Sequence, residues 1–296
     1  MTYEIYNLYG MYGEPWPRGD LAKGAMGHPA KFSRALIRQI YKICFEEGWV
    51  KKGDRVLDIF AGVGLGAMDA MINGLRWRGI ELESKYQKLG EANITLWRRK
   101  YANLPLFNPD AIIYQGDSQN LLKTVSSGDI NISSPPYAQT ALHFDANSLG
   151  TDKVTGEHIK QPFPLIEGAR NYSKDKNNLG NMPDDKFWSA AHTIIDQLFI
   201  ALKPGAHAIF VCKSYVRGGK TIEFPTQWRM LCEAAGFATE RIYYAWTAEN
   251  RGTQIDLQGN HHTKIVDHKS MFRRLQEKKG SPKIEYEEVL VFIKQQ

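Results

Sequence analysis

The chain has few cysteines and no long apolar run, and these two absences exclude several protein classes. Its three cysteines, Cys44, Cys212 and Cys232, show neither metal-binding nor redox spacing, so we expect reduced thiols and no metal site. No apolar run reaches the roughly 18 to 20 residues that a membrane-spanning helix needs. The first residues, MTYEIYNLYG, lack the basic start and apolar core of a signal peptide. We therefore expect a cytoplasmic protein without a membrane partner.

The composition supports a large folded core. The chain has 296 residues, of which 43% are hydrophobic, enough for one large α/β domain with sizeable insertions. Its net charge of +6 permits a polyanionic partner but does not require one. The sequence contains no internal repeat and no low-complexity tract.

Apolar runs and helical periodicity alternate along the chain. The runs predict seven strands, at 54–60, 76–83, 110–117, 127–137, 207–213, 239–248 and 285–294. The periodic segments predict five helices, at 31–48, 67–75, 84–102, 185–206 and 225–237. This alternation predicts a Rossmann-like α/β fold with a mostly parallel sheet and helices on both faces. The last strand follows no helix, so we expect it to pair antiparallel with its predecessor as a C-terminal hairpin.

Three segments lie outside this regular pattern. Residues 1–30 are rich in Gly, Pro and Tyr and predict an irregular arm packed on the domain. Residues 31–296 predict a single domain with two insertions, at 138–185 and about 249–283. The first insertion is too long to be a mere connection.

A glycine-rich turn follows the first predicted strand. In LDIFAGVGLGA, Gly62 and Gly64 lack side chains, so a ligand can approach the backbone at the start of the next helix. About twenty residues on, the next strand ends at Glu81, which can accept hydrogen bonds from both hydroxyls of a ribose. Together with Ala67, the two glycines also satisfy the dinucleotide pattern G-x-G-x-x-G/A, so a nicotinamide cofactor is an alternative.

Two aspartates bear on the choice of cofactor. Asp58 lies within a buried strand, where a carboxylate is costly unless it meets a cation. S-adenosyl-L-methionine offers an ammonium and a sulfonium, whereas a dinucleotide offers phosphates there. The alternative is that Asp58 caps the helix or pairs with Lys52 or Arg55. At the end of the third strand, Asp117 can accept from an adenine amino group or cap the following helix, and these two roles are compatible.

Two motifs together resemble a known enzyme family. DIFAGVG (58–64) followed by SSPPY (133–137) is similar to the paired signature of S-adenosylmethionine-dependent amino-methyltransferases of nucleic acids. These enzymes methylate cytosine N4 or adenine N6. The resemblance extends to HPAKF (28–32) and to residues 271–294, and leaves out the first 25 or so residues and the 138–185 insertion. Many enzymes with a Ser-Pro-Pro-Tyr motif place it before the glycine motif, whereas here it follows.

The resemblance implies a seven-stranded methyltransferase sheet and a cofactor site. The resemblance implies that residues 28–32 approach the methionine end of S-adenosylmethionine. It also implies that Asp58 holds the ammonium of the cofactor and that Glu81 holds its ribose. The expected product of the cofactor is S-adenosyl-L-homocysteine. The expected cofactor-binding residues are His28, Pro29, Lys31, Phe32, Asp58, Phe60, Gly62, Gly64, Glu81, Leu82, Asp117 and Ser118.

The Ser-Pro-Pro-Tyr motif explains how a poor nucleophile could react. An exocyclic amine must become more tetrahedral to attack a methyl group, with its hydrogens held by acceptors. The Ser134 hydroxyl and the Pro135 carbonyl can be those acceptors, Pro136 stiffens the turn, and Tyr137 can stack on a base turned out of the helix. The alternative is a strand-ending turn with a core tyrosine. A cytosine C5 methyltransferase needs a cysteine nucleophile, usually directly after a proline. None of the three cysteines here follows a proline, so this reaction is not expected.

A serine in first position accompanies cytosine N4 in most of the family, so we expect a cytosine-N4 methyltransferase. Adenine N6 in DNA and cytidine N4 in structured RNA remain alternatives, as does a binding module or dehydrogenase on the same sheet. Double-stranded DNA is the expected partner, with or without a cognate restriction nuclease.

The first insertion and the later part of the second insertion differ in charge. Residues 138–185 carry five Lys/Arg and seven Asp/Glu, whereas residues 261–283 carry seven and two. We therefore assign base reading and pocket closure to the first segment and phosphate binding to the second, with a solvated helix face as the alternative. The expected nucleic-acid-binding residues are Lys269, Arg273, Arg274, Lys278 and Lys279.

Overall fold

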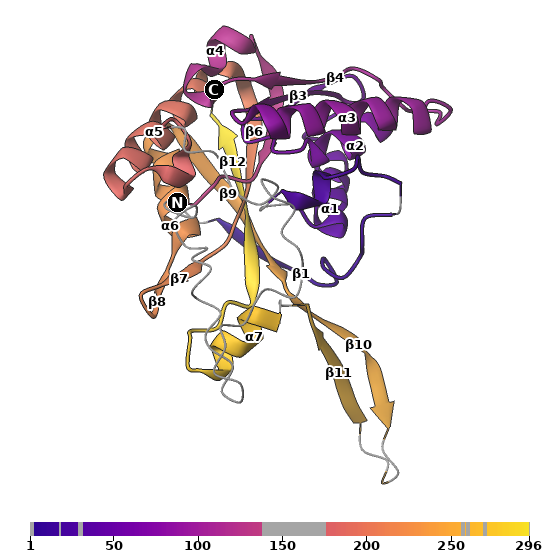
Figure 1. The fold of residues 1–296 in the computed structure, drawn as a ribbon, viewed down its shortest axis with the longest axis vertical. Coiled ribbons are helices and arrows are strands. Elements are labelled where there is room, and N and C mark those ends of the chain that lie inside the picture. The colour runs from indigo at the N-terminus through magenta and orange to yellow at the C-terminus, as the bar shows by residue number, and fades with distance from the viewer. Residues whose placement is uncertain are drawn as a thin grey trace, which may run out of the picture.

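An eight-stranded sheet forms the centre of the protein in a computed structural model, which describes residues 3–17, 19–28, 32–137, 176–255, 258, 261–268 and 271–295 (Figure 1). From one edge to the other, the strands are β1 (Glu4–Leu8), β9 (Phe237–Trp246), β12 (Tyr286–Lys294), β6 (Leu202–Cys212), β5 (Gly128–Ser133), β2 (Arg55–Asp58), β3 (Arg76–Glu81) and β4 (Ala111–Gln115).

Strand directions confirm the expected fold class. The strands β6, β5, β2, β3 and β4 pair in parallel. The C-terminal strand β12 lies between β6 and β9 and is antiparallel to both, so β9 runs in the same direction as the parallel strands. The carboxyl ends of all these strands except β12 therefore meet at one edge, which is where open α/β sheets bind ligands.

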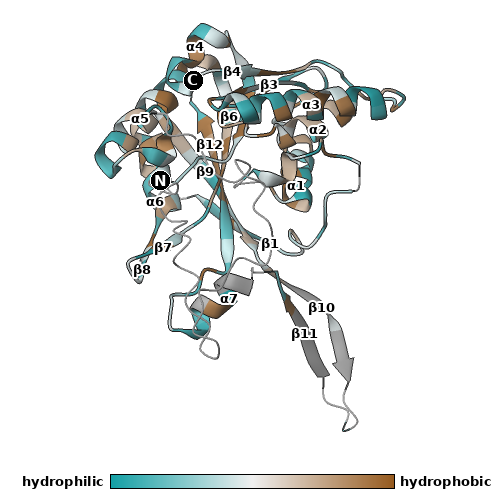
Figure 2. Ribbon diagram, viewed as in Figure 1, coloured by the Kyte–Doolittle hydropathy of each residue, from teal (hydrophilic) through white to brown (hydrophobic). Residues whose placement is uncertain are grey.

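Helices cover both faces of the sheet, because each buries one apolar side. On one face, α1 (Arg34–Glu46), α2 (Leu65–Ile72) and α3 (Ser84–Lys100) share a core with the sheet. On the other face, α4 (Leu121–Thr124), α5 (Asp184–Ala201) and α6 (Phe224–Ala234) form a second core. Apolar residues gather along the central strands and the inner sides of the helices (Figure 2). All three cysteines are free and buried.

The N-terminal arm differs from the prediction of an irregular segment. After Tyr3, residues Glu4–Leu8 form β1, which pairs in parallel with β9 and adds an eighth strand at the edge. Tyr6 stacks on Tyr243 and Tyr9 on Trp246, with ring centroids 5.2 Å and 6.2 Å apart. Residues Glu4–Leu8 of the arm thus form a strand because they pair with β9, and aromatic residues of β9, more than 230 positions away, pack against the arm. A 3-10 turn follows at Ala25–Gly27.

The second insertion forms regular structure. β10 (Ala248–Ile255) and β11 (His261–Asp267) pair antiparallel, and α7 (Met271–Lys278) follows. Figure 1 shows this pair projecting away from the rest of the fold. A smaller hairpin joins β7 (Tyr215–Arg217) to β8 (Lys220–Ile222). In the first insertion, residues 138–175 lie outside the described residues. No helix of the described part is long and apolar enough to span a bilayer.

Candidate active site

A cavity lies at the carboxyl ends of β2, β3, β4 and β5, with about 890 Å³ of space including its open mouth. Eleven of the predicted cofactor and catalytic residues line it: His28, Phe32, Phe60, Gly62, Glu81, Leu82, Asp117, Ser118, Ser134, Pro135 and Pro136. Asp58, Gly64 and Tyr137 are not in its lining, and Pro29 and Lys31 lie outside the described residues.

The glycine turn needs a residue without a side chain. Gly62 has a φ of +55°, and a Cβ built there would lie 3.0 Å from His28 Cε1. The His28 ring is buried and packs edge-on against Tyr86, with centroids 4.3 Å apart. A side chain at position 62 would therefore meet both backbone strain and a fixed imidazole, and the turn stays open toward the cavity.

Glu81 closes the same turn from the neighbouring strand. Its Oε2 accepts from the Gly62 N–H at 2.9 Å, and its Oε1 accepts from the Glu83 N–H at 2.8 Å. Burial raises the pKa of this carboxyl to about 8, against the lowering effect of both hydrogen bonds. Each carboxylate oxygen keeps a second lone pair, so the geometry leaves room for the predicted ribose hydroxyls.

Asp117 and Ser118 form the wall at the end of β4. The Asp117 Oδ1 accepts from the Gln119 N–H at 2.9 Å, which caps the 3-10 turn Ser118–Asn120. The Ser118 hydroxyl donates to the Ile59 carbonyl at 2.6 Å. The capping alternative is confirmed for Asp117, while its contact with an adenine amino group stays a prediction.

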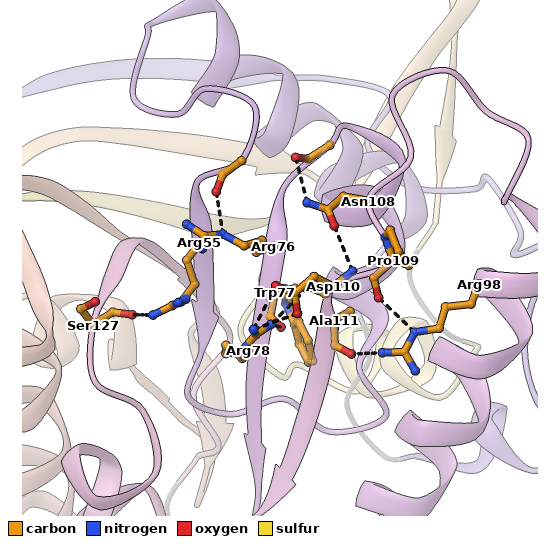
Figure 3. Close-up of polar contacts among 12 residues, drawn as sticks. Arg55, Arg76, Trp77, Arg78, Arg98, Asn108, Pro109, Asp110, Ala111 and Ser127 are labelled. Carbon is orange, nitrogen blue, oxygen red and sulfur yellow. Dashed lines mark hydrogen bonds and ion pairs between the residues drawn. The ribbon is translucent and has the colours of Figure 1, made fainter.

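Asp58 lies behind the cavity wall. Its carboxyl is 1% exposed, Oδ1 accepts from the Phe60 N–H at 3.2 Å, and Oδ2 has no hydrogen-bond partner among the described residues. Burial raises its pKa to about 7. Arg55 does not neutralise it, because that guanidinium donates to the Ser127 carbonyl at the opposite end of β2 (Figure 3). A contact between Asp58 and a ligand ammonium stays a prediction.

Two consecutive serines end β5 and use their hydroxyls differently. The Ser133 hydroxyl is fully buried, accepts from the Ile59 N–H at 2.9 Å and donates to Asn131 Oδ1 at 3.0 Å. The Ser134 hydroxyl donates to the Val211 carbonyl of β6 at 3.0 Å and lines the cavity. Because its proton is committed to Val211, only acceptor lone pairs of Ser134 remain for a ligand.

Tyr137 occupies a different place from the one expected. Its ring packs against Phe224 and Tyr215, with centroids 4.9 Å and 5.4 Å away, and burial raises the pKa of its hydroxyl well above the usual value. This arrangement corresponds to the alternative of a core tyrosine. Phe224 of α6 offers the ring an apolar site next to the turn, and the stacking of Tyr137 on a target base stays a prediction.

Sequence reasoning missed one wall of the cavity. Asn178 and Leu179, near the end of the first insertion, line it together with Glu83. Asn178 Nδ2 donates to Glu83 Oε1 at 2.8 Å, and Asn178 Oδ1 accepts from the Gly180 N–H. The returning chain is therefore attached to the cavity rim, whereas closure of the pocket by this insertion stays a prediction. No local signal pointed to Asn178, because about forty residues separate it from the Ser-Pro-Pro-Tyr turn.

The predicted phosphate-binding residues lie on or next to α7. Arg274, Lys278 and Lys279 are exposed, whereas Lys269 and the side chain of Arg273 lie outside the described part. Their role in nucleic-acid binding stays a prediction.

Comparisons with known proteins give a likeness of fold. No protein-family model and no curated protein matches the chain. Among solved structures, TrmN from Thermus thermophilus is 13% identical over 88% of this chain and 48% of its own, with a TM-score of 0.42. A SAM-dependent methyltransferase from Methanosarcina mazei is 13% identical over 85% and 97%, with a TM-score of 0.44. A putative RNA methyltransferase from Pyrococcus horikoshii is 11% identical over 97% and 95%, with a TM-score of 0.46. Likeness at this level assigns no function.

Proposed function

We propose that this protein is an S-adenosylmethionine-dependent methyltransferase that acts on cytosine N4 in DNA. The observation that carries the proposal is the layout of the cavity at the carboxyl ends of the parallel strands. It brings Gly62, Glu81 and Asp117, as a candidate nucleoside-binding set, together with Ser134, which donates its proton to Val211 and keeps its oxygen lone pairs to accept hydrogen bonds.

The residues present fit this cofactor. Glu81 supplies acceptors for ribose hydroxyls, Asp117 supplies one for the adenine amino group, and Ile80 and Leu82 supply apolar walls for the adenine ring. Gly62 lets the ligand approach the backbone. The orphaned Oδ2 of the buried Asp58 favours a nearby positive charge. When bound, S-adenosylmethionine supplies an electrophilic methyl group on a sulfonium.

Ser134 and its neighbours prepare the amine. The Ser134 oxygen accepts one amine hydrogen, and the Pro135 carbonyl, held by the fixed φ of proline, accepts the other. Both contacts direct the nitrogen lone pair along the line of attack, so positioning supplies most of the rate increase. No cysteine takes part, since all three are buried and burial raises the pKa of each thiol.

The choice of base rests on the serine of the tetrapeptide. Adenine N6 in DNA and cytidine N4 in RNA are the runner-up substrates, because the described residues include no contact that distinguishes them. The test is mass spectrometry of nucleosides after incubation of the protein with S-adenosylmethionine and mixed duplex DNA. N4-methyldeoxycytidine is the expected product. N6-methyladenine would move the proposal to the other base, and methylated nucleoside from structured RNA alone would exclude DNA. If neither DNA nor structured RNA yields a methylated nucleoside, the proposal that the protein is a methyltransferase is refuted.

Glu81 should make ligand binding pH-dependent. Ribose hydroxyls donate to the carboxylate, so binding is favoured when Glu81 is ionised, above its pKa of about 8. We expect 5′-methylthioadenosine, which lacks the ammonium, to bind about tenfold more tightly at pH 9 than at pH 7. Isothermal titration calorimetry measures this change. Glu81→Gln should weaken binding and remove the pH dependence, while Glu91→Gln, at an exposed position of α3, should leave both unchanged. Equal pH profiles for the two variants would contradict the assignment.

Arg274 should contribute to the salt dependence of DNA binding. If its guanidinium neutralises a phosphate, Arg274→Glu should lower the slope of log Kd against log salt by about 1 or more. Fluorescence anisotropy with a labelled duplex measures the slope. Arg99→Glu is the matched control, since Arg99 is exposed in the last turn of α3. Equal slopes in the two variants would remove α7 from the interface.

A further inference from the structure

The β10–β11 pair starts at the same edge of the sheet as the catalytic turn. β9 runs parallel to β5, so its carboxyl end points toward the edge where Ser134 lies. The chain leaves β9 through Thr247, whose N–H and hydroxyl both donate to the Glu285 carbonyl at 2.8 Å and 2.7 Å. On its return, the His268 N–H donates to the Thr247 carbonyl at 2.9 Å. The base of the pair is therefore fixed to the catalytic edge.

The N-terminal arm holds this base from another side. A Cβ built at Gly13 would overlap the His268 ring, so the arm lies in direct contact with the root of β11. Two residues before Gly13 in the arm, the Met11 carbonyl accepts a hydrogen bond from the hydroxyl of Ser33, at the start of α1. The root of the pair is thus connected to the helix that follows the HPAKF segment.

Beyond its root, the pair stands alone. β10 and β11 form a two-stranded sheet of their own, with eight and seven residues, and no other described strand pairs with them. At 3.2–3.4 Å per residue they are about 25 Å long, and they project away from the other elements drawn as helices and strands (Figure 1). An isolated two-stranded hairpin is only marginally stable in water. We therefore expect a binding partner to stabilise this pair.

The size of the pair fits the major groove of duplex DNA. Two strands about 4.8 Å apart, with their side chains, match a groove that is about 12 Å wide and about 8.5 Å deep and admits a two-stranded ribbon. The minor groove of undistorted B-DNA, about 6 Å wide, is narrower than such a ribbon, which enters it only where the duplex is deformed. The target cytosine is turned out of the helix for methylation, so a ribbon in the major groove would lie beside the base edges that flank the target.

The composition of the segment agrees with this partner. Residues 248–283 contain eight Lys/Arg and four Asp/Glu, so they carry +4 of the chain's net charge of +6. The sequence of the two strands and of the described residue between them is rich in the side-chain types that read base edges: Asn250, Arg251, Gln254, Gln258 and Lys264. A membrane or protein surface would call for more apolar residues.

We propose that the β10–β11 ribbon enters the major groove next to the target cytosine and reads the DNA sequence, with α7 on the flanking phosphates. This rests on the proposed DNA substrate and revises the division of roles predicted from sequence. The ribbon takes the base-reading role that was assigned to the first insertion.

The test is selection of binding sites from a random duplex library with the S-adenosylhomocysteine-bound protein. In the variant, an Asn-Gly turn replaces residues 250–265, which keeps the root pairs Ala248–Asp267 and Glu249–Val266. Wild type should enrich one motif, and the variant should lose the preference of about 10³-fold or more over random sequence. An unchanged rise in Tm with S-adenosylhomocysteine shows that the variant is folded.

A milder variant guards against a folding artefact. Gln254 and His262 face each other in the register of the ribbon, and replacing both by Ala should weaken or change the motif. Gln227→Ala, at an exposed position of α6, should not. Dimethyl sulfate modification of guanine N7, in the major groove, should interfere with wild-type binding to the motif, and modification of adenine N3, in the minor groove, should not.

The outcomes separate the two proposals. A wild-type motif that the shortened variant still selects, no wild-type motif at all, or interference from the minor groove alone would each overturn the role of the ribbon. A motif that depends on the ribbon but is never methylated at cytosine N4 would leave the ribbon in place and refute the proposed function.

Discussion

Ser134→Ala should reduce methyl transfer by about 100-fold or more, the scale seen when one preorganised hydrogen-bonding group is removed from an active site. The variant loses the acceptor that holds one amine hydrogen. That contact matters most as the nitrogen becomes tetrahedral, so kcat should fall and the KM for DNA should change little. Single-turnover methylation, followed by nucleoside mass spectrometry, measures the effect.

The neighbouring serine provides a matched control. Ser133→Ala removes a fully buried hydroxyl and leaves the Ile59 N–H without its acceptor, which should lower the free energy of unfolding by about 1–3 kcal/mol. Ser134→Ala should have a smaller effect on stability, because the Ser134 side chain is partly exposed at the cavity. In both variants, S-adenosylhomocysteine should still raise the Tm. A Ser134→Ala enzyme with wild-type kcat would show that the hydroxyl is only part of a strand-ending turn.

The main sheet was predictable because local patterns determine it. The apolar strands and the amphipathic helices alternate in the sequence, and alternation forces a parallel sheet. β1 was not predictable, because the stacking of Tyr6 and Tyr9 on β9 stabilises it across most of the chain. The β10–β11 ribbon was missed for a similar reason, since its polar residues carry no apolar alternation.

For the site, sequence determined which residues reach the edge but not where their side chains point. Gly62, Glu81 and Ser134 follow or end neighbouring parallel strands, and such ends must converge. Tyr137 turns toward α6 and Asp58 toward α2 because of packing between distant elements, and no local rule gives these directions. Packing explains why two of the motif residues do not line the cavity.

Asp58→Asn should change the pH dependence of stability, because it replaces a carboxyl whose pKa is raised by burial with a group that does not titrate. Burial raises the folded pKa of Asp58 from 3.8 to about 7, so the folded state holds a proton that the unfolded state has already released. Its contribution to stability is present below pH 4 and is lost as the pH rises through 7. The loss is on the order of 4 kcal/mol. Glu81 and Glu288 act in the same direction, so the comparison must be made between variants.

Urea unfolding between pH 5 and pH 9 measures the difference between wild type and Asp58→Asn. The variant should gain stability relative to wild type as the pH rises toward 8, and the gain should level off above it. Asp185→Asn, at an exposed position in the first turn of α5, should show no such trend. A pH-independent difference for Asp58→Asn would mean that the carboxyl is ionised in the folded protein at all these pH values.

Two ligands can then decide whether Asp58 senses the ammonium of the cofactor. S-adenosylhomocysteine carries an ammonium and 5′-methylthioadenosine does not, although both carry the adenosine that Glu81 and Asp117 would hold. A positive charge near Asp58 lowers its pKa, so S-adenosylhomocysteine should flatten the fall in wild-type stability between pH 5 and 7 more than 5′-methylthioadenosine does. In Asp58→Asn the two ligands should act alike. If they also act alike in wild type, the ammonium is held elsewhere, and Asp58 serves the glycine turn through the Phe60 N–H alone.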